Sequence, residues 1–292
     1  MSDSTATQSV HAFCKSVLLR GDLQSKLSPG GSLDDSDPGP PLEISQPARD
    51  PDLSLVGHSS PLPRPGTLGD PAARAECLAR FAHHELMAVE LFAWALLRWP
   101  DVEPALRQDW LALLADEQTH CRLYLQRLEA HGSSLSRHAL ADYFWKQVPA
   151  IVASPAGPRA FLAAMGLTLE QANLDFSLLY RDAFRSAGDE ASARVCERVH
   201  RDEIRHVHSA AHWIARLADA PGDDLDAYLA AVPFPLSAAR AKARRFDVPA
   251  RQSAGLSARF IAHVRDARST QETGHPRADE ATTPLAEPVE SE

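Results

Sequence analysis

Apolar residues recur at every third or fourth position through the middle of the chain, and this period predicts amphipathic helices. The first helix is expected over about residues 71–99, after Asp70, a favourable N-cap, and with Pro71 at its first position. Pro100 ends it, and a second helix is expected to extend to about residue 131. A long helical hairpin is therefore predicted here.

A second hairpin is predicted further along the chain. Gly157 and Pro158 open a third helix, which is expected to continue to about residue 186. Gly188 suits the position after a helix end and Asp189 suits the next N-cap, so a fourth helix follows and extends to about residue 217.

The lengths of the connections predict how the four helices pack. The first and second helices are joined by a few residues, as are the third and fourth, so each pair is antiparallel. The segment 132–157 between the pairs is long. Two hairpins joined by one long crossover form the ferritin-like arrangement of a four-helix bundle, so we predict an all-α fold.

Three further segments are predicted around this bundle, which is assigned to residues 71–220. Residues 1–70 are expected to be an extension, with one short helix followed by a largely irregular stretch rich in Pro and Gly. Residues 221–266 are expected to form short C-terminal helices, and residues 267–292 a polar, disordered tail.

Composition narrows the class of protein. The chain of 292 residues has a formal net charge of −9, which argues against general nucleic-acid binding. Its four cysteines are widely spaced, so reduced thiols are expected rather than disulfides. No signal peptide is recognisable, and no apolar run approaches the roughly 18–20 residues that span a bilayer. A soluble, cytoplasmic protein is expected.

Two copies of one motif stand in the second helix of each hairpin. The stretch DEQTH carries Glu117 and His120, and the stretch DEIRH carries Glu203 and His206. Residues three apart share one face of a helix, so each Glu and His point the same way. One such motif is usually a solvent-exposed pair of residues without a function. Two motifs at matching places in two hairpins predict a shared site.

A partner carboxylate is expected in the first helix of each hairpin, and the spacing supplies one. Glu85 precedes Glu117 by 32 residues, and Glu170 precedes Glu203 by 33 residues. Glu90 lies close to the first of these positions but breaks the matched spacing, so Glu85 is favoured. Four Glu and two His in a bundle core are the ligands of a di-iron or di-manganese centre.

Charge supports this assignment, because two divalent ions balance four glutamates in an apolar core. We expect Glu117 and Glu203 to bridge the metals, and Asp116 and Asp202 to bind the free imidazole nitrogens of the two histidines. The metals are expected to be two Fe ions, with Mn or mixed Mn/Fe left open, because the same ligands serve both.

The stretches HHELMAVELFAWAL, DEQTHCRLYLQRL, LTLEQANLDF and DEIRHVHSAAHWI together resemble the ferritin-like di-metal carboxylate superfamily. They are most similar to its uncharacterised bacterial branch, the domain of unknown function 455, as is the early SVLLRGDLQSKL. The resemblance covers about residues 13–30 and 72–217 and matches all six metal positions. It implies a metal site and oxygen chemistry rather than any substrate, because the superfamily includes ferroxidases, peroxidases and oxygenases.

Other polar and aromatic residues are expected to have structural roles. Five histidines are interpreted as helix-face or satisfied core residues: His83, His84, His200, His208 and His212. Core packing is preferred to electron transfer for five aromatic residues: Tyr124, Tyr180, Trp94, Trp110 and Trp213. A solvated helix face is preferred to an anion site for the basic cluster Arg240, Lys242, Arg244, Arg245 and Arg251.

The sequence therefore predicts an oxidoreductase that activates O₂ or peroxide, with a hydroxylase or oxygenase favoured. The expected partners are a small-molecule substrate, O₂ or peroxide, and an electron donor of unknown identity; a modified-RNA substrate and a homodimer stay open. A ferroxidase or metal-handling protein is the alternative, and a non-catalytic bundle is the third hypothesis.

Overall fold

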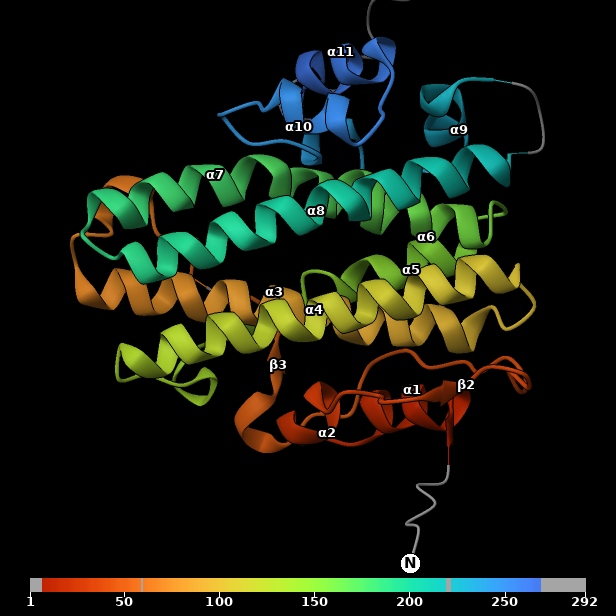
Figure 1. The fold of residues 1–292 in the computed structure, drawn as a ribbon, viewed down its shortest axis with the longest axis horizontal. Coiled ribbons are helices and arrows are strands. Elements are labelled where there is room, and N and C mark those ends of the chain that lie inside the picture. The colour runs from red at the N-terminus through yellow and green to blue at the C-terminus, as the bar shows by residue number, and fades with distance from the viewer. Residues whose placement is uncertain (1–6, 59, 219–221, 269–292) are drawn as a thin grey trace, which may run out of the picture.

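The computed structural model describes residues 7–58, 60–218 and 222–268, and it is mostly helical (Figure 1). Three long helices are α3 (Pro71–Arg98), α4 (Pro104–Ala130) and α8 (Glu190–Arg216). A fourth long helical segment joins α6 (Pro158–Ala164), the π-helix η5 (Met165–Glu170) and α7 (Gln171–Ser186). The all-α class predicted from the sequence is confirmed.

The long helices pack as two hairpins. Helix α3 lies along α4, α7 lies along α8, and α4 also contacts α8, so the two hairpins meet through the helices that carry the paired motifs. The crossover between the hairpins contains β4 (Leu140–Ala141) and α5 (Val148–Ala153). The core lies between these four helical segments.

The helix ends follow the predicted local chemistry. Asp70 accepts a hydrogen bond from the Ala72 backbone N–H at the start of α3, and Asp189 accepts one from Ser192 at the start of α8. Gly188 has a φ of 78°, a conformation that suits glycine, which allows the tight turn between α7 and α8.

The third long helix differs from the prediction of an uninterrupted α-helix. Residues Met165–Glu170 form a π-helix, a rare feature that is often found at functional sites. Gly166 lies in this segment, and a Cβ atom there would be 2.2 Å from the Cβ of Ala210 in α8. Glycine therefore lets the π-helix approach α8 closely.

The N-terminal extension contains two helices where the sequence predicted one. Helices α1 (Val10–Leu19) and α2 (Leu23–Leu27) lie on the α3–α4 side of the molecule, with α1 packed on α3 (Figure 1). The extension also forms two short pairs of parallel strands. Strand β1 (Gln8–Ser9) pairs with β2 (Leu33–Asp34), and β3 (Leu55–Val56) pairs with β4 of the crossover.

A buried ion cluster anchors this extension. The Glu90 carboxylate of α3 accepts two hydrogen bonds from Arg49, at 2.7 and 2.8 Å, and one from the Trp145 indole at 3.0 Å. The ammonium group of Lys26 lies 2.9 Å from the same carboxylate. Through these contacts, Glu90 links both the extension and the crossover to α3.

The C-terminal helices cover the opposite side, over α7 and α8 (Figure 1). They are α9 (Asp224–Ala231), α10 (Val248–Ser253) and α11 (Ala258–Asp266). Short 3₁₀ turns occur at Pro51–Leu53, Pro65–Thr67, Leu135–Arg137, Trp145–Gln147 and Ala238–Arg240. Beyond Arg268, the predicted tail lies outside the described residues.

Arg251 corrects the prediction of a basic surface cluster. Its side chain is buried and makes two hydrogen bonds to the buried Asp175 carboxylate of α7, at 2.7 and 3.0 Å. Asp175 also accepts hydrogen bonds from the backbone N–H groups of Ala243 and Asp247. Arg251 therefore holds the C-terminal segment on α7 instead of presenting charge to solvent.

Within the described ranges, no helix is both long enough and apolar enough to cross a membrane.

Candidate metal centre

The structure brings together all six residues that the sequence selected as metal ligands. They come from four helical segments and are all buried: Glu85 of α3, Glu117 and His120 of α4, Glu170 of η5, and Glu203 and His206 of α8. Their ligand atoms form two groups, each with its atoms within 4.8 Å of one another. The first group is Glu85, Glu117, His120 and Glu203; the second is Glu117, Glu170 and His206.

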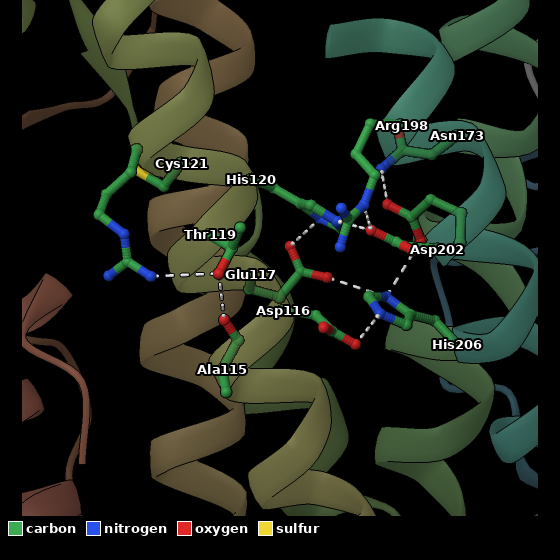
Figure 2. Close-up of polar contacts among 12 residues, drawn as sticks. Ala115, Asp116, Glu117, Thr119, His120, Cys121, Asn173, Arg198, Asp202 and His206 are labelled. Carbon is green, nitrogen blue, oxygen red and sulfur yellow. Dashed lines mark hydrogen bonds and ion pairs between the residues drawn. The ribbon is translucent and has the colours of Figure 1, made fainter. Parts of the chain in front are cut away.

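Glu117 belongs to both groups and lies between the two imidazoles (Figure 2). Its Oε1 is 2.9 Å from Nδ1 of His206, and its Oε2 is 3.5 Å from Nδ1 of His120. The second expected bridge, Glu203, has its Oε2 3.4 Å from Nδ1 of His206. Both carboxylates that are expected to bridge the metals therefore face the same interior space.

Each histidine is held through its outer nitrogen by an aspartate of the other hairpin. Nε2 of His120 lies 3.1 Å from Asp202 of α8, and Nε2 of His206 lies 3.3 Å from Asp116 of α4. The two rings stack with their centroids 5.7 Å apart. This crossed pattern fixes both rings so that the Nδ1 atoms face the carboxylates.

Two arginines that sequence reasoning missed complete the outer network. Arg205 donates hydrogen bonds to Asp116 at 3.1 Å and to Asp202 at 3.2 Å, so it ties the two aspartates together. Arg198 donates a 2.5 Å hydrogen bond to Asp202. Both arginines are about half exposed, so the aspartates form the boundary between solvent and the buried ligands.

The inner atoms of the cluster have no hydrogen-bond partner among the described residues. These atoms are both carboxylate oxygens of Glu117 and of Glu170, Oε2 of Glu203, and Nδ1 of both histidines. Several lie within 3.5 Å of one another, yet none of these contacts has hydrogen-bond geometry. Oxygen and nitrogen atoms that face a common space, instead of a hydrogen-bond partner, are what cation coordination requires, so these residues fit a metal pair.

Burial and mutual proximity shift the pKa values of the ligands in different directions. Burial raises the pKa of Glu85 well above its usual value, and the nearby Glu117 charge raises it further. Burial likewise raises the pKa of Glu170. Burial opposes ionisation of Glu117, but contacts with His120 and His206 outweigh it and hold its pKa well below the usual range.

The histidines shift upward. Burial disfavours the charged form of His120, but its contacts with Asp202 and Glu117 raise its pKa to about 9. Contacts with Asp116, Glu117 and Glu203 overcome burial and raise the pKa of His206 as well. These shifts favour the protonated forms of the two imidazoles, Glu85 and Glu170, and the ionised form of Glu117.

Two elements position the ligands of the second hairpin. Glu170 is the last residue of the π-helix, so the altered turn sets the direction of its carboxylate. Glu203 accepts a 2.9 Å hydrogen bond from the Asn173 side chain, one turn further along the same helical segment. Asn173 was not selected from the sequence, because a single amide on a helix carries no pattern.

The alternatives weighed from the sequence lie outside the cluster. Glu90 belongs to the buried ion cluster with Lys26 and Arg49. His208 contacts the Ala254 carbonyl oxygen, and His200 contacts the Ser177 hydroxyl. Both ring nitrogens of His83 are buried without a hydrogen-bond partner among the described residues, so it is not the satisfied core histidine that was expected.

Comparison with known proteins places the chain in a family. Residues 5–262 match the family described as "Protein of unknown function (DUF455)". The chain belongs to this family. An uncharacterized protein of Haemophilus influenzae (strain ATCC 51907 / DSM 11121 / KW20 / Rd) is 27% identical over 157 residues, which cover 51% of this chain and 54% of that protein. The chain thus spans about half the length of this curated relative, and no solved structure matches.

Proposed function

We propose that this DUF455 member is a ferritin-like di-metal carboxylate oxidoreductase that activates O₂ or peroxide. The observation that carries the proposal is the buried set of four Glu and two His, whose inner oxygen and nitrogen atoms face one another without hydrogen bonds. Oxygen and imidazole ligands suit two Fe ions, and they also suit Mn or a mixed Mn/Fe pair. When bound, such a pair supplies the electrons that O₂ or peroxide accepts.

The chain's own residues supply the environment for this chemistry. Glu85 and His120 would hold one ion and Glu170 and His206 the other, with Glu117 and Glu203, which reach both histidines, shared between them. The crossed aspartates keep both imidazoles in one orientation by accepting hydrogen bonds from the outer Nε2–H groups. The apolar core around the cluster excludes bulk water, which protects a strong oxidant from side reactions.

A hydroxylase or oxygenase acting on a small molecule is the favoured form of this activity. A modified RNA base stays a less favoured substrate. A ferroxidase is the second candidate, because the same ligands also suit iron as a substrate. A non-catalytic bundle is disfavoured, since folding alone gives no reason to bury four carboxylates and two imidazoles together.

Oxygen uptake after anaerobic loading with Fe(II) tests the proposal. We expect oxidation to stop after about two Fe per chain when no reductant is added, because a resident pair is consumed only once. Sustained oxidation of many Fe per chain would instead identify a ferroxidase. A Glu170→Ala variant is the control. Oxygen uptake by the wild-type protein that is no faster than uptake by this variant would exclude both activities.

A further inference from the structure

A basic groove with an aromatic floor lies between the segment before α3, helix α7 and the C-terminal segment. Its volume is about 820 Å³, which falls within the roughly 300–1,000 Å³ of sites for small organic ligands. Phe176, Leu179 and Tyr180 of α7 and Phe246 of the C-terminal segment form its apolar lining. The Arg251 guanidinium packs 3.9 Å from the Phe246 ring centroid and holds that ring in place.

The charged residues that line this groove are all basic. Arg64, Lys242, Arg244 and Arg265 line it, and none of the described lining residues is acidic, although the whole chain has a net charge of −9. Lys242 is bound to backbone carbonyl oxygens and Arg265 to Asp266, but Arg64 and Arg244 make no side-chain hydrogen bond or ion pair with the described residues. Among the residues that the structure describes, two guanidinium groups are therefore available for an anion.

A row of aromatic rings connects the groove to the candidate metal centre. Tyr180 lines the groove and packs edge-on against Phe81, with ring centroids 5.0 Å apart. Phe81 in turn lies 5.4 Å from the Tyr124 ring. Phe81 is one helical turn before Glu85 on α3, and Tyr124 is one turn after His120 on α4, so the row ends beside two ligands.

We propose that this groove binds a phosphorylated, flat aromatic redox molecule of the flavin mononucleotide class. The ring system would lie on Phe176, Leu179 and Phe246 beside Tyr180, with the phosphate at Arg64 and Arg244. An adenine nucleotide also has a phosphate and a flat ring. Its ring is not redox-active, however, so it would have no electrons to pass along the aromatic row. The assignment of a redox role rests on the proposed function, whereas binding does not.

The electron balance of this role is simple. A reduced flavin mononucleotide returns to its oxidised form by giving up two electrons and releasing two protons to solvent at the groove. The two electrons would cross the packed rings of Tyr180, Phe81 and Tyr124 and reduce two trivalent ions of the bound pair to the divalent state, one electron each. The rings themselves are neither oxidised nor reduced, because they only shorten the gap between donor and acceptor.

Binding of flavin mononucleotide to the protein as purified, followed by flavin fluorescence, tests the proposal. We expect saturable binding that weakens by about tenfold or more in the Arg64→Glu, Arg244→Glu variant, through loss of charge-assisted contacts to phosphate. Arg20→Glu is the matched control, because Arg20 is an exposed arginine at the end of α1, on the opposite side of the molecule, and should leave affinity unchanged.

Riboflavin and AMP show which parts of the ligand the groove recognises. Riboflavin, which lacks the phosphate, should bind about tenfold more weakly, and AMP should also bind more weakly than flavin mononucleotide. No saturable binding at millimolar flavin mononucleotide, riboflavin binding equally well, or AMP binding equally well would each overturn the proposal. So would binding that appears only after residues 269–292 are removed, since that acidic segment would then be the occupant.

The metal-loaded protein then tests the redox role. Reduced flavin mononucleotide should reduce the oxidised centre at least about tenfold more slowly in Phe81→Leu than in the wild type, while dithionite reduces both equally. Equal rates with the flavin would overturn the redox role. A protein that binds the flavin but holds no metal would instead contradict the proposed function and leave the binding site standing.

Discussion

At the scale of single residues, the crossed histidine–aspartate pairs connect the two hairpins through the site. Asp202 of α8 holds His120 of α4, and Asp116 of α4 holds His206 of α8. A change in either aspartate is therefore expected to act on a ligand of the other motif, through the orientation and protonation of its ring.

An Asp202→Asn variant tests this coupling. The neutral amide accepts the His120 hydrogen bond without the negative charge of the carboxylate, so we expect the metal affinity to fall by about 10–100-fold with the fold intact. Isothermal titration with Mn(II) would measure it. Asp182→Asn is the matched control, because Asp182 forms an exposed ion pair with Arg245; an equal loss in both variants would contradict the role of Asp202.

Proton release on metal binding is the second prediction at this scale. The pKa of His120 is raised to about 9, so this imidazole carries a proton at neutral pH, and the pKa values of His206, Glu85 and Glu170 are also raised. Two divalent ions therefore displace at least one proton per chain, from His120, and further protons from the other groups whose pKa values are raised. Affinity should rise with pH up to about 9. Indicator dye in weak buffer would measure the release; fewer than one proton per chain would contradict this balance.

Much of the site follows from spacing along the chain, but its outer contacts do not. The matched intervals from Glu85 to Glu117 and from Glu170 to Glu203 identify the inner carboxylates, because an α-helix repeats its faces regularly. Arg205 carries no comparable signal, since arginines are common on helix surfaces. Its role depends on Asp116, which lies 89 residues earlier in the chain.

At the scale of elements, the π-helix η5 sets the position of Glu170 and depends on a close contact with α8. Sequence periodicity predicted helix here, and helix is present. The π-turn could not be predicted, because it depends on the approach of Gly166 to Ala210 across two helices. Local propensity carries no information about that contact.

A Gly166→Ala variant should separate η5 from α8. The added methyl group would lie 2.2 Å from the Ala210 Cβ, so one helix must move, and we expect a loss of about 1–3 kcal/mol in the free energy of unfolding. Urea denaturation would measure it. Gly69→Ala is the control, because a Cβ atom there meets nothing within 4 Å; an unchanged stability in Gly166→Ala would contradict the close contact.

At the scale of the whole molecule, buried ion pairs hold both terminal segments on the long helices. Glu90 binds the N-terminal extension through Arg49 and Lys26, and Asp175 binds the C-terminal segment through Arg251. The basic cluster predicted at 240–251 was partly wrong because Asp175, the partner of Arg251, lies 76 residues away in sequence. Only the tertiary fold brings these charges together.

Asp175→Asn tests the C-terminal attachment. Removing one partner leaves Arg251 buried without a counter-charge, so we expect a loss of about 3–5 kcal/mol in stability and earlier proteolytic cleavage within residues 222–268. Asp182→Asn breaks an exposed pair that the same helix makes with Arg245 and should cost about 0–1 kcal/mol. Similar losses in the two variants would contradict a structural role for the buried pair.

Metal content per chain tests the central claim most directly. The protein purified without chelator should hold about two iron or manganese ions, and a Glu117→Ala, Glu203→Ala variant that remains helical by circular dichroism should hold none. A folded wild-type protein that stays empty after anaerobic reconstitution with Fe(II) and with Mn(II) would contradict the metal centre and the oxidoreductase built on it.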